Sequence, residues 1–273
     1  MLSLSAGNMQ SLSVRGRNSF DGELVVHCRT YAPELSRIAG EAAMRQLVAS
    51  WTARASAHGL TLRGPTRLFA ELALTFGSSF DTDPQLAWAA QFLADHDSDE
   101  MTRARSLFTA SHEFLMDTAG PDDAYSWQAL RQVRQMVGLP PGNPGEALEA
   151  RILGALHQVH PNKARIVGDA ALLRLVERAR LTCRQHRLAG DPPVLLLTGM
   201  MFGFGHGIAQ DPLYPWVART LARTPAPAGD VRATQLARKV MIYIDHMLAR
   251  LAPKSANAVD DDWLADLSGE RDT

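Results

Sequence analysis

The sequence predicts an all-α protein in which two tandem helical repeats, related by pseudo-two-fold symmetry, form one bundle-like globule. Three observations lead to this prediction. Residues 33–94 align without a gap on residues 161–222, at an offset of 128 positions, and 20 of the 62 paired residues are identical. Apolar residues recur at helical spacing between Pro and Gly residues that start and stop helices. Segments with the alternation typical of β-strands are nearly absent.

The two repeats share one conspicuous stretch, which occurs at residues 76–88 and again at 204–216. Both copies read Phe-Gly, a short gap, Asp-Pro, and a Trp four residues after the Pro. A duplication with only two copies favours a pair of equivalent units over a solenoid, which usually needs three or more repeats. The shared residues are Phe76, Gly77, Asp83, Pro84 and Trp88 in the first copy, and Phe204, Gly205, Asp211, Pro212 and Trp216 in the second.

Local residue preferences place the helices of the first half. Pro33 and Pro65 suit first helical turns, where the missing N–H costs nothing. Gly59 suits a helix end. Asp83 and Pro84 are typical of an N-cap and a first helical residue, and the same holds for Asp211 and Pro212. The expected helices cover residues 21–31, 35–58, 65–76, 85–94, 99–116 and 127–137.

The second half repeats this plan, with helices expected at 146–159, 162–188, 193–206, 212–222 and 230–251. Val194–Leu197 is the best strand candidate, but its equivalent, Thr66–Phe69, belongs to an expected helix. A Pro- and Gly-rich linker lies where the duplication requires a boundary. The predicted organisation is a disordered N-terminus at 1–20, a first repeat at 21–137, the linker at 138–145, a second repeat at 146–252 and an acidic tail at 253–273.

Composition narrows the functional classes. Among 273 residues the formal net charge is −1, so no basic field recruits nucleic acid or an anionic membrane. Cys28 and Cys183 do not form a disulfide framework and are expected to be small buried hydrophobes. The sequence lacks a signal peptide pattern and any apolar run long enough to span a membrane, which favours a cytoplasmic location.

Two carboxylates in the first copy could ligate a divalent metal, because Asp81 and Asp83 form an Asp-x-Asp pair. The duplication tests this idea, since the equivalent positions are Ala209 and Asp211. Both copies therefore keep the Asp-Pro pair and not the paired carboxylates. We expect Asp83 and Asp211 to cap the helices that follow, and we predict no metal and no cofactor.

His206 is the first place to look for a reactive site, because it lies in a Gly-rich turn shortly before Asp211. A His–Asp pair could perform acid–base chemistry. The equivalent residue in the first copy is Ser78, so the turn itself does not need a histidine. His157 and His160 could bind metal at i,i+3 spacing, but no further ligand falls at a supporting spacing. No catalytic residue is assigned.

The tail contains a short acidic amphipathic segment. Trp263, Leu264 and Leu267 supply its apolar residues after three consecutive Asp residues. A loosely ordered terminus accounts for this composition, and a docking peptide for a partner groove is the alternative.

The repeated stretch also carries a resemblance to a known group of proteins. The pattern of Gly40, Glu41, Ala42 and Leu47, followed by His58-Gly59 and the Phe-Gly…Asp-Pro…Trp stretch, resembles helical proteins encoded near type VI secretion spike and effector genes in Gram-negative bacteria. This resemblance implies an immunity protein, or a chaperone or adaptor that loads an effector. Its partner would be a secreted effector or a component of the secretion spike.

Two functional hypotheses follow. The first is a non-enzymatic protein-binding accessory protein of this kind. The second is an enzyme or a small-ligand-binding protein with a site between the repeats, around His206 and Asp211. A closed apolar cavity lined by His206 would favour the second hypothesis, whereas a broad groove with aromatic anchors would favour the first. Trp88 and Trp216 are expected to be largely buried anchors of their repeats.

Overall fold

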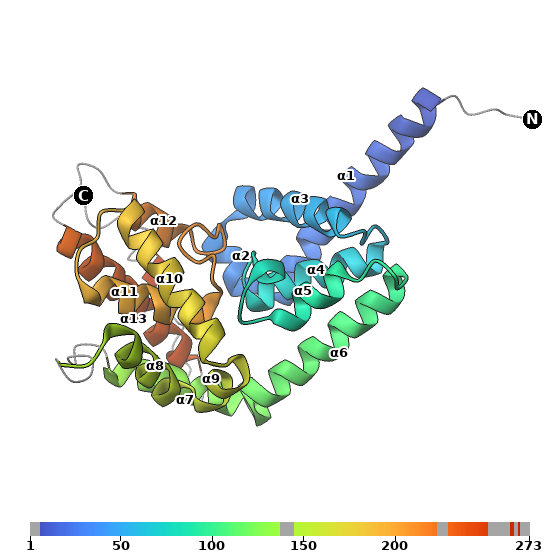
Figure 1. Cartoon of the computed structure of the whole chain (residues 1–273). Helices are drawn as coiled ribbons and strands as arrows, with labels where there is room; N and C mark the ends of the chain where they lie inside the picture. Colours follow the sequence, from blue (N-terminus) through green and yellow to red (C-terminus); the bar gives the residue numbers. More distant parts are fainter. Residues whose placement is uncertain (1–5, 137–144, 223–228, 251–262, 265–266, 268–273) are drawn as a thin grey trace, which may run out of the picture.

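The computed structural model describes residues 6–136, 145–222, 229–250, 263–264 and 267 (Figure 1). Every regular element in these ranges is helical, which confirms the all-α prediction. None of the helices in these ranges combines the length and the apolar character that a membrane crossing requires. The α-helices of the first half are α1 (Ala6–Tyr31), α2 (Pro33–Ala39), α3 (Glu41–Ala57), α4 (Arg63–Phe76), α5 (Ala87–Ala94), α6 (Glu100–Ala119) and α7 (Ala124–Met136). Those of the second half are α8 (Leu148–Val159), α9 (Pro161–Val167), α10 (Asp169–Gln185), α11 (Asp191–Phe204), α12 (Pro215–Leu221) and α13 (Gly229–Ala249).

The bounds of several helices in the two halves differ by the offset of the sequence repeat. Helices α2, α3 and α4 begin and end 128 residues before α9, α10 and α11, and α5 begins 128 residues before α12. Val194–Leu197, the best strand candidate, lies within α11. The two long helices expected at 35–58 and 162–188 are each divided in two. The breaks fall at Gly40 and Gly168, whose φ angles of +83° and +78° favour glycine.

Helix α1 is longer than expected, because it begins at Ala6 and not at Asp21. It therefore covers most of the segment 1–20 that composition predicted to be disordered. Its C-terminal part carries the buried side chains of Leu24, Val25 and Cys28. Its N-terminal part projects away from the other helices (Figure 1). Small polar residues carry little periodic signal, so composition alone does not reveal how far a helix continues beyond its packed part.

Helices α6 and α13 cover the two halves in the same way. Helix α6 packs on α4 and α5, and α13 packs on α11 and α12. Each long helix carries a buried arginine near its start. Arg103 donates to the carbonyl oxygen of His58, and Arg232 donates to that of His186, both at 2.6 Å. These guanidinium groups satisfy carbonyl groups at the ends of α3 and α10, which have no partner within their own helices.

The two halves share one core. Helix α6 reaches α9, and α7 packs against α8 and α13, so the last helix assigned to the first repeat lies on the second half. The buried apolar side chains form one contiguous cluster that draws on both halves. Cys28 and Cys183 are buried free thiols within this cluster, which confirms the expectation for both.

The tryptophans of the repeated stretch differ in burial. Trp216 is 1% exposed, as expected for a core anchor. Trp88 is half-buried and packs against the core, so it is covered less completely than Trp216. Its ring packs edge-on against Phe76 at 5.8 Å between centroids. Trp51 is also 1% exposed, although its equivalent residue is an alanine.

Candidate functional site

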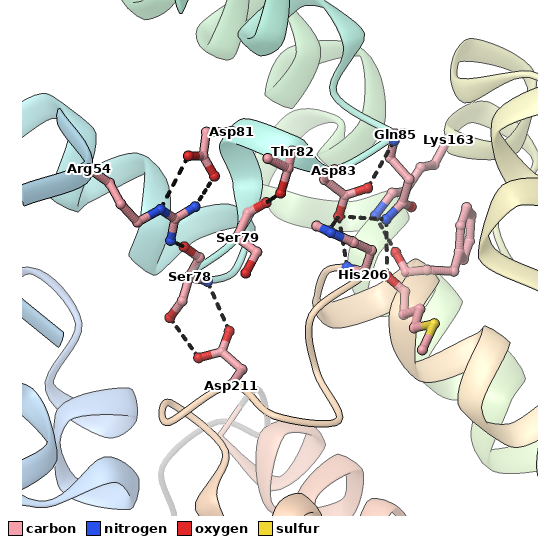
Figure 2. A network of polar contacts seen from close by, with 12 residues as sticks. Arg54, Ser78, Ser79, Asp81, Thr82, Asp83, Gln85, Lys163, His206 and Asp211 are labelled. Atoms are coloured by element: carbon pink, nitrogen blue, oxygen red, sulfur yellow. Dashed lines mark hydrogen bonds and ion pairs between the residues drawn. The ribbon is translucent and has the colours of Figure 1, made fainter. Parts of the chain in front are cut away.

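The two copies of the repeated stretch face one another, and we call residues 76–85 and 204–213 the junction (Figure 2). Gly77 ends α4 and Gly205 ends α11, with φ angles of +98° and +97°. A Cβ added to Gly77 would lie 2.7 Å from the carbonyl oxygen of Phe204. A Cβ added to Gly205 would lie 2.5 Å from that of Phe76. The repeated Phe-Gly pair thus serves a close backbone-to-backbone contact between the halves.

The two Asp-Pro carboxylates make equivalent local hydrogen bonds. The N–H of Gln85 donates to Asp83 Oδ1, and the N–H of Leu213 donates to Asp211 Oδ1, both at 2.9 Å. The helices begin later, however, at Ala87 and Pro215, so the prediction that these residues are helix N-caps is wrong. An Asp in a turn accepts the same kind of nearby N–H as an Asp at an N-cap, and local sequence does not distinguish the two.

The second oxygen of each carboxylate crosses the junction. The N–H of His206 donates to Asp83 Oδ2, and the N–H of Ser78 donates to Asp211 Oδ2, both at 2.8 Å. The hydroxyl of Ser78 also donates to Asp211 Oδ1 at 2.6 Å. Figure 2 shows these bonds on opposite sides of the junction. Each half therefore supplies the carboxylate that satisfies an otherwise unpaired N–H of the other half.

The pKa values of the two carboxylates are shifted in opposite directions by their surroundings. Asp83 and Asp211 are 3% and 4% exposed. Burial raises the pKa of Asp211 above its ordinary value, against the hydrogen bonds from Ser78. Burial also acts to raise the pKa of Asp83, but the hydrogen bonds from His206 and Gln85 outweigh it, and the net pKa is lowered.

The imidazole of His206 contacts Asp83 and not Asp211. Its Nδ1 lies 3.3 Å from Asp83 Oδ2, and the residue is 7% exposed. His206 and Asp211 therefore do not form the pair that was considered for acid–base chemistry. The carboxylate that contacts each residue comes from the other half, and proximity along the chain does not reveal that exchange.

Asp81 belongs to a separate contact on the first half. The guanidinium of Arg54 donates to both carboxylate oxygens of Asp81 and to the carbonyl oxygen of Ser78. His58 Nε2 lies 3.3 Å from Asp81 Oδ2. Asp81 and Asp83 thus have different partners. Among the described residues, no three His, Cys, Asp or Glu side chains gather where they could hold a metal ion.

The two histidines at 157 and 160 also separate. His157 Nε2 lies 2.8 Å from Asp169 Oδ1, whereas His160 Nδ1 accepts the N–H of Lys163 at the start of α9. Burial lowers the pKa of His160 to about 4, and the neighbouring charge of Lys163 lowers it further. Burial lowers the pKa of Lys163 to about 8. The Lys163 ammonium donates to the carbonyl oxygen of Phe202 at 2.5 Å.

Sequence reasoning did not identify Arg54, Gln85 or Lys163. Gln85 donates to the carbonyl oxygen of Met201 at 3.0 Å, so it and Lys163 both bind the last turn of α11. None of the three is repeated at the offset of 128, where Thr182, Leu213 and Leu35 stand. The duplication that identified the junction therefore carried no signal for them.

Two hollows lie beside the junction. The larger, of about 350 Å³, lies between α3, α10 and both junction loops, and the smaller, of about 200 Å³, lies against α10 and α11. His206 lines only the smaller. Neither is a closed apolar cavity or a broad groove with aromatic anchors. The larger is lined by Gln46, Leu47, Ser50, Trp51, Arg54, Ser78, Ser79, Arg178, Gly207, Gln210, Asp211 and Pro212.

The described residues of the tail pack on the chain itself. The ring of Trp263 stacks on that of His246 in α13, with centroids 3.7 Å apart and planes 16° apart. Trp263 and Leu267 are buried, and Leu264 is half-buried. The apolar side chains that could dock on a partner are thus covered by their own protein. The rest of the predicted tail, including its three consecutive Asp residues, lies outside the described residues.

Comparison with protein-family models, curated proteins and solved structures found no match to this chain.

Proposed function

We propose that this protein is a non-enzymatic, protein-binding accessory protein. Its expected class is an immunity protein, or a chaperone or adaptor, for a type VI secretion effector in the bacterial cytoplasm. The role of the junction supports this proposal. The shared Gly and Asp residues of the two copies contact the opposite half, and each of the two Asp carboxylates accepts backbone N–H groups. The protein-binding surface is therefore to be sought outside the junction.

The observation that carries the proposal is an exposed apolar stripe along α6. Met101, Phe108 and Met116 are 51%, 60% and 56% exposed, and their spacing places them on one side of the helix. The Phe108 ring lies parallel to that of His112, with centroids 6.4 Å apart. Methionine and aromatic side chains are typical of protein-binding surfaces, because they cover large apolar areas and adapt in shape.

Exposed polar residues flank this stripe on the side away from the core, and we call it the α6 stripe and define it as Met101, Phe108, His112 and Met116. The exposed neighbours on α6 are polar or charged: Thr102, Arg105, Thr109, Glu113 and Asp117. An apolar centre with a polar rim is the usual anatomy of a protein–protein interface. The long helix α6 forms one edge of the molecule (Figure 1), and the exposed stripe residues on it are accessible to a partner.

We further infer that the two halves are copies of one ancestral unit, related by a pseudo-two-fold axis that passes near Gly77 and Gly205. The equal helix bounds at the offset of 128 support this inference. So do the reciprocal hydrogen bonds of Asp83 and Asp211, which have equal lengths in the two directions. In this arrangement the halves form an internal dimer, and the α6 stripe belongs to the first half alone.

The test measures binding to the product of the effector or spike gene that neighbours this gene. We expect the two proteins to co-purify as a defined complex. Phe108→Glu should weaken binding by at least about 30-fold, because loss of an interface hot spot costs about 2 kcal/mol or more. Val26→Glu is the matched control, since Val26 is 62% exposed on α1 and lies outside the stripe. Absence of a complex, or equal weakening by both variants, would overturn the proposal.

The alternative, an enzyme with a site around His206 and Asp211, receives less support. The two side chains bind different partners across the junction, and the acid–base pair that motivated the hypothesis is not formed. A small-ligand site near His206 does not depend on that pair, because the smaller hollow is lined by His206 together with Arg178 and other polar residues.

A further inference from the structure

Among the positions at which the two halves differ, two that are in contact in the first half lie in or beside the junction. In the first half, Arg54 reaches from α3 to Asp81 and to the junction carbonyl of Ser78, so the two side chains form an ion pair. At the offset of 128 the equivalent residues are Thr182 and Ala209. Thr182 donates its hydroxyl to the carbonyl of Arg178 within α10, at 3.0 Å. Neither short side chain can replace the ion pair.

Thr182 and Ala209 both line the smaller hollow, of about 200 Å³, which we call the second-half cavity. Its floor is made of buried residues that include Thr182, His206 and Ala209. Its rim includes the exposed residues Arg178 and Gln210. Its complete lining is Arg178, Leu181, Thr182, Gln185, Met201, His206, Gly207, Ala209 and Gln210.

The lining carries a positive charge and no negative charge. It contains a guanidinium, an imidazole and two side-chain amides, and it contains no carboxylate. Within the described part of the chain, the Arg178 guanidinium has no acidic partner, whereas Arg180 on the same helix pairs with Glu149 at 2.6 Å. A guanidinium presents paired N–H groups that match a carboxylate in a bidentate geometry. The cavity therefore offers donors and a positive charge to an anion.

We propose that the second-half cavity binds a small organic acid, with a carboxylate of the ligand on Arg178. The ligand's body then lies against Thr182 and Ala209, the positions that correspond to Arg54 and Asp81 in the first half. A volume of about 200 Å³ is below the usual range of drug-sized pockets, roughly 300–1,000 Å³, so the ligand is a compact acid and not a peptide. Gln185 and Gln210 at the rim bind its polar groups.

This site is independent of the proposed protein partner. The α6 stripe belongs to another helix and shares no residue with the cavity lining. The larger hollow shares Arg178, Gly207 and Gln210 with the cavity, so the two are neighbours. A ligand with a second polar group can extend in that direction, towards the hydroxyls of Ser50 and Ser79.

The first experiment uses succinate and L-glutamate as probes, with inorganic phosphate as the comparator. We expect at least one of the two acids to bind the full chain saturably in calorimetry, with a Kd of about 1 mM or lower, and to raise the melting temperature. Arg178→Gln should weaken this binding at least tenfold. Arg184→Gln is the matched control, because Arg184 is exposed on the same helix and lies outside the cavity lining.

The second experiment fills the cavity with the residues of the first half. The double variant Thr182→Arg with Ala209→Asp should rebuild the ion pair and abolish binding of the acids. If this variant does not fold, Ala209→Leu fills the same space with one apolar side chain and serves instead. Binding to the protein partner should be unchanged, which separates this proposal from the proposed function.

The outcomes divide clearly. Saturable binding that Arg178→Gln and the filled cavity both abolish supports the proposal. If neither acid binds saturably, or if binding survives in the variant with the filled cavity, the proposal is overturned. Equal weakening by Arg178→Gln and Arg184→Gln would show an unspecific charge effect and would also overturn it. Phosphate that binds as tightly as the acids would overturn the assignment of a carboxylate ligand.

Discussion

The close contact between Gly77 and Gly205 makes a sharp prediction about stability. In Gly205→Ala, the added methyl group would lie 2.5 Å from the carbonyl oxygen of Phe76, a backbone atom that has no side-chain freedom with which to move away. The φ angle of +97° and ψ angle of 147° are also a combination that residues with a Cβ rarely adopt. The substitution therefore combines backbone strain with overpacking.

The two contributions have separate magnitudes. Strain in a glycine-only backbone region costs about 1–3 kcal/mol. Overpacking a tight contact costs about 1–3 kcal/mol more. The expected loss in the free energy of unfolding is thus about 4 kcal/mol. Since a domain is stable by only about 5–15 kcal/mol, Gly205→Ala should remove a large share of the total.

Gly168→Ala is the matched control, and urea unfolding followed by circular dichroism is the assay. Gly168 has a similar backbone, with φ +78° and ψ 149°, but a Cβ at this position would meet no atom within 4 Å. Both substitutions change the unfolded chain equally, so that contribution cancels. The difference between the two variants should be about 1–3 kcal/mol, with an unchanged dependence on urea.

Equal losses of stability in the two variants, to within about 0.5 kcal/mol, would contradict this expectation. That result would mean that the halves move apart easily at the junction, and that Gly205 is needed only for its backbone conformation. The reciprocal substitution, Gly77→Ala, provides an independent comparison, because its Cβ would lie 2.7 Å from the carbonyl oxygen of Phe204.

Three further predictions concern the junction and its surroundings. Asp211→Ala should cost about 2–4 kcal/mol, because the buried N–H of Ser78 loses its acceptor, and a loss below about 1 kcal/mol in urea unfolding would contradict this. Folding lowers the pKa of Lys163 from 10.5 to about 8, so between these pH values the unfolded chain binds more protons and stability rises with pH. The rise should be at most about 3 kcal/mol, and Lys163→Met should abolish it, whereas an unchanged pH profile would refute the assignment. Trp216→Ala should cost about 3–5 kcal/mol, and Trp88→Ala distinctly less because its ring is half-buried, and equal losses in thermal melting would contradict the difference.

Much of the fold could be predicted from local sequence. Helical spacing and the positions of Pro and Gly predicted nearly every helix, because these preferences act within a few residues of the chain. Asp99 illustrates this, since it lies just before α6 and accepts the N–H groups of Met101 and Thr102. The offset of 128 also predicted which helices of the two halves would have equal bounds. The breaks at Gly40 and Gly168 were missed, because apolar spacing continues across them.

The partners at the junction were decided only by the tertiary structure. The sequence singled out Asp83, His206 and Asp211, but it placed Asp83 and Asp211 at helix starts. The candidate partner that it suggested for His206 was Asp211, the nearest carboxylate along the chain. In the folded protein, Ser78 binds Asp211 at a separation of 133 residues, and His206 binds Asp83 at a separation of 123. Such pairs depend on how two complete helical units pack, and no local preference encodes that packing.

The second-half cavity likewise depends partly on the sequence and partly on the tertiary structure. The sequence by itself determined that Arg54 and Asp81 have no charged equivalents in the second repeat, since Thr182 and Ala209 stand there. Only the tertiary structure decided that Arg54 and Asp81 contact one another, and that Thr182 and Ala209 line one hollow. Whether short side chains leave a cavity depends on how far their neighbours close in, and those neighbours come from segments that are distant in the sequence.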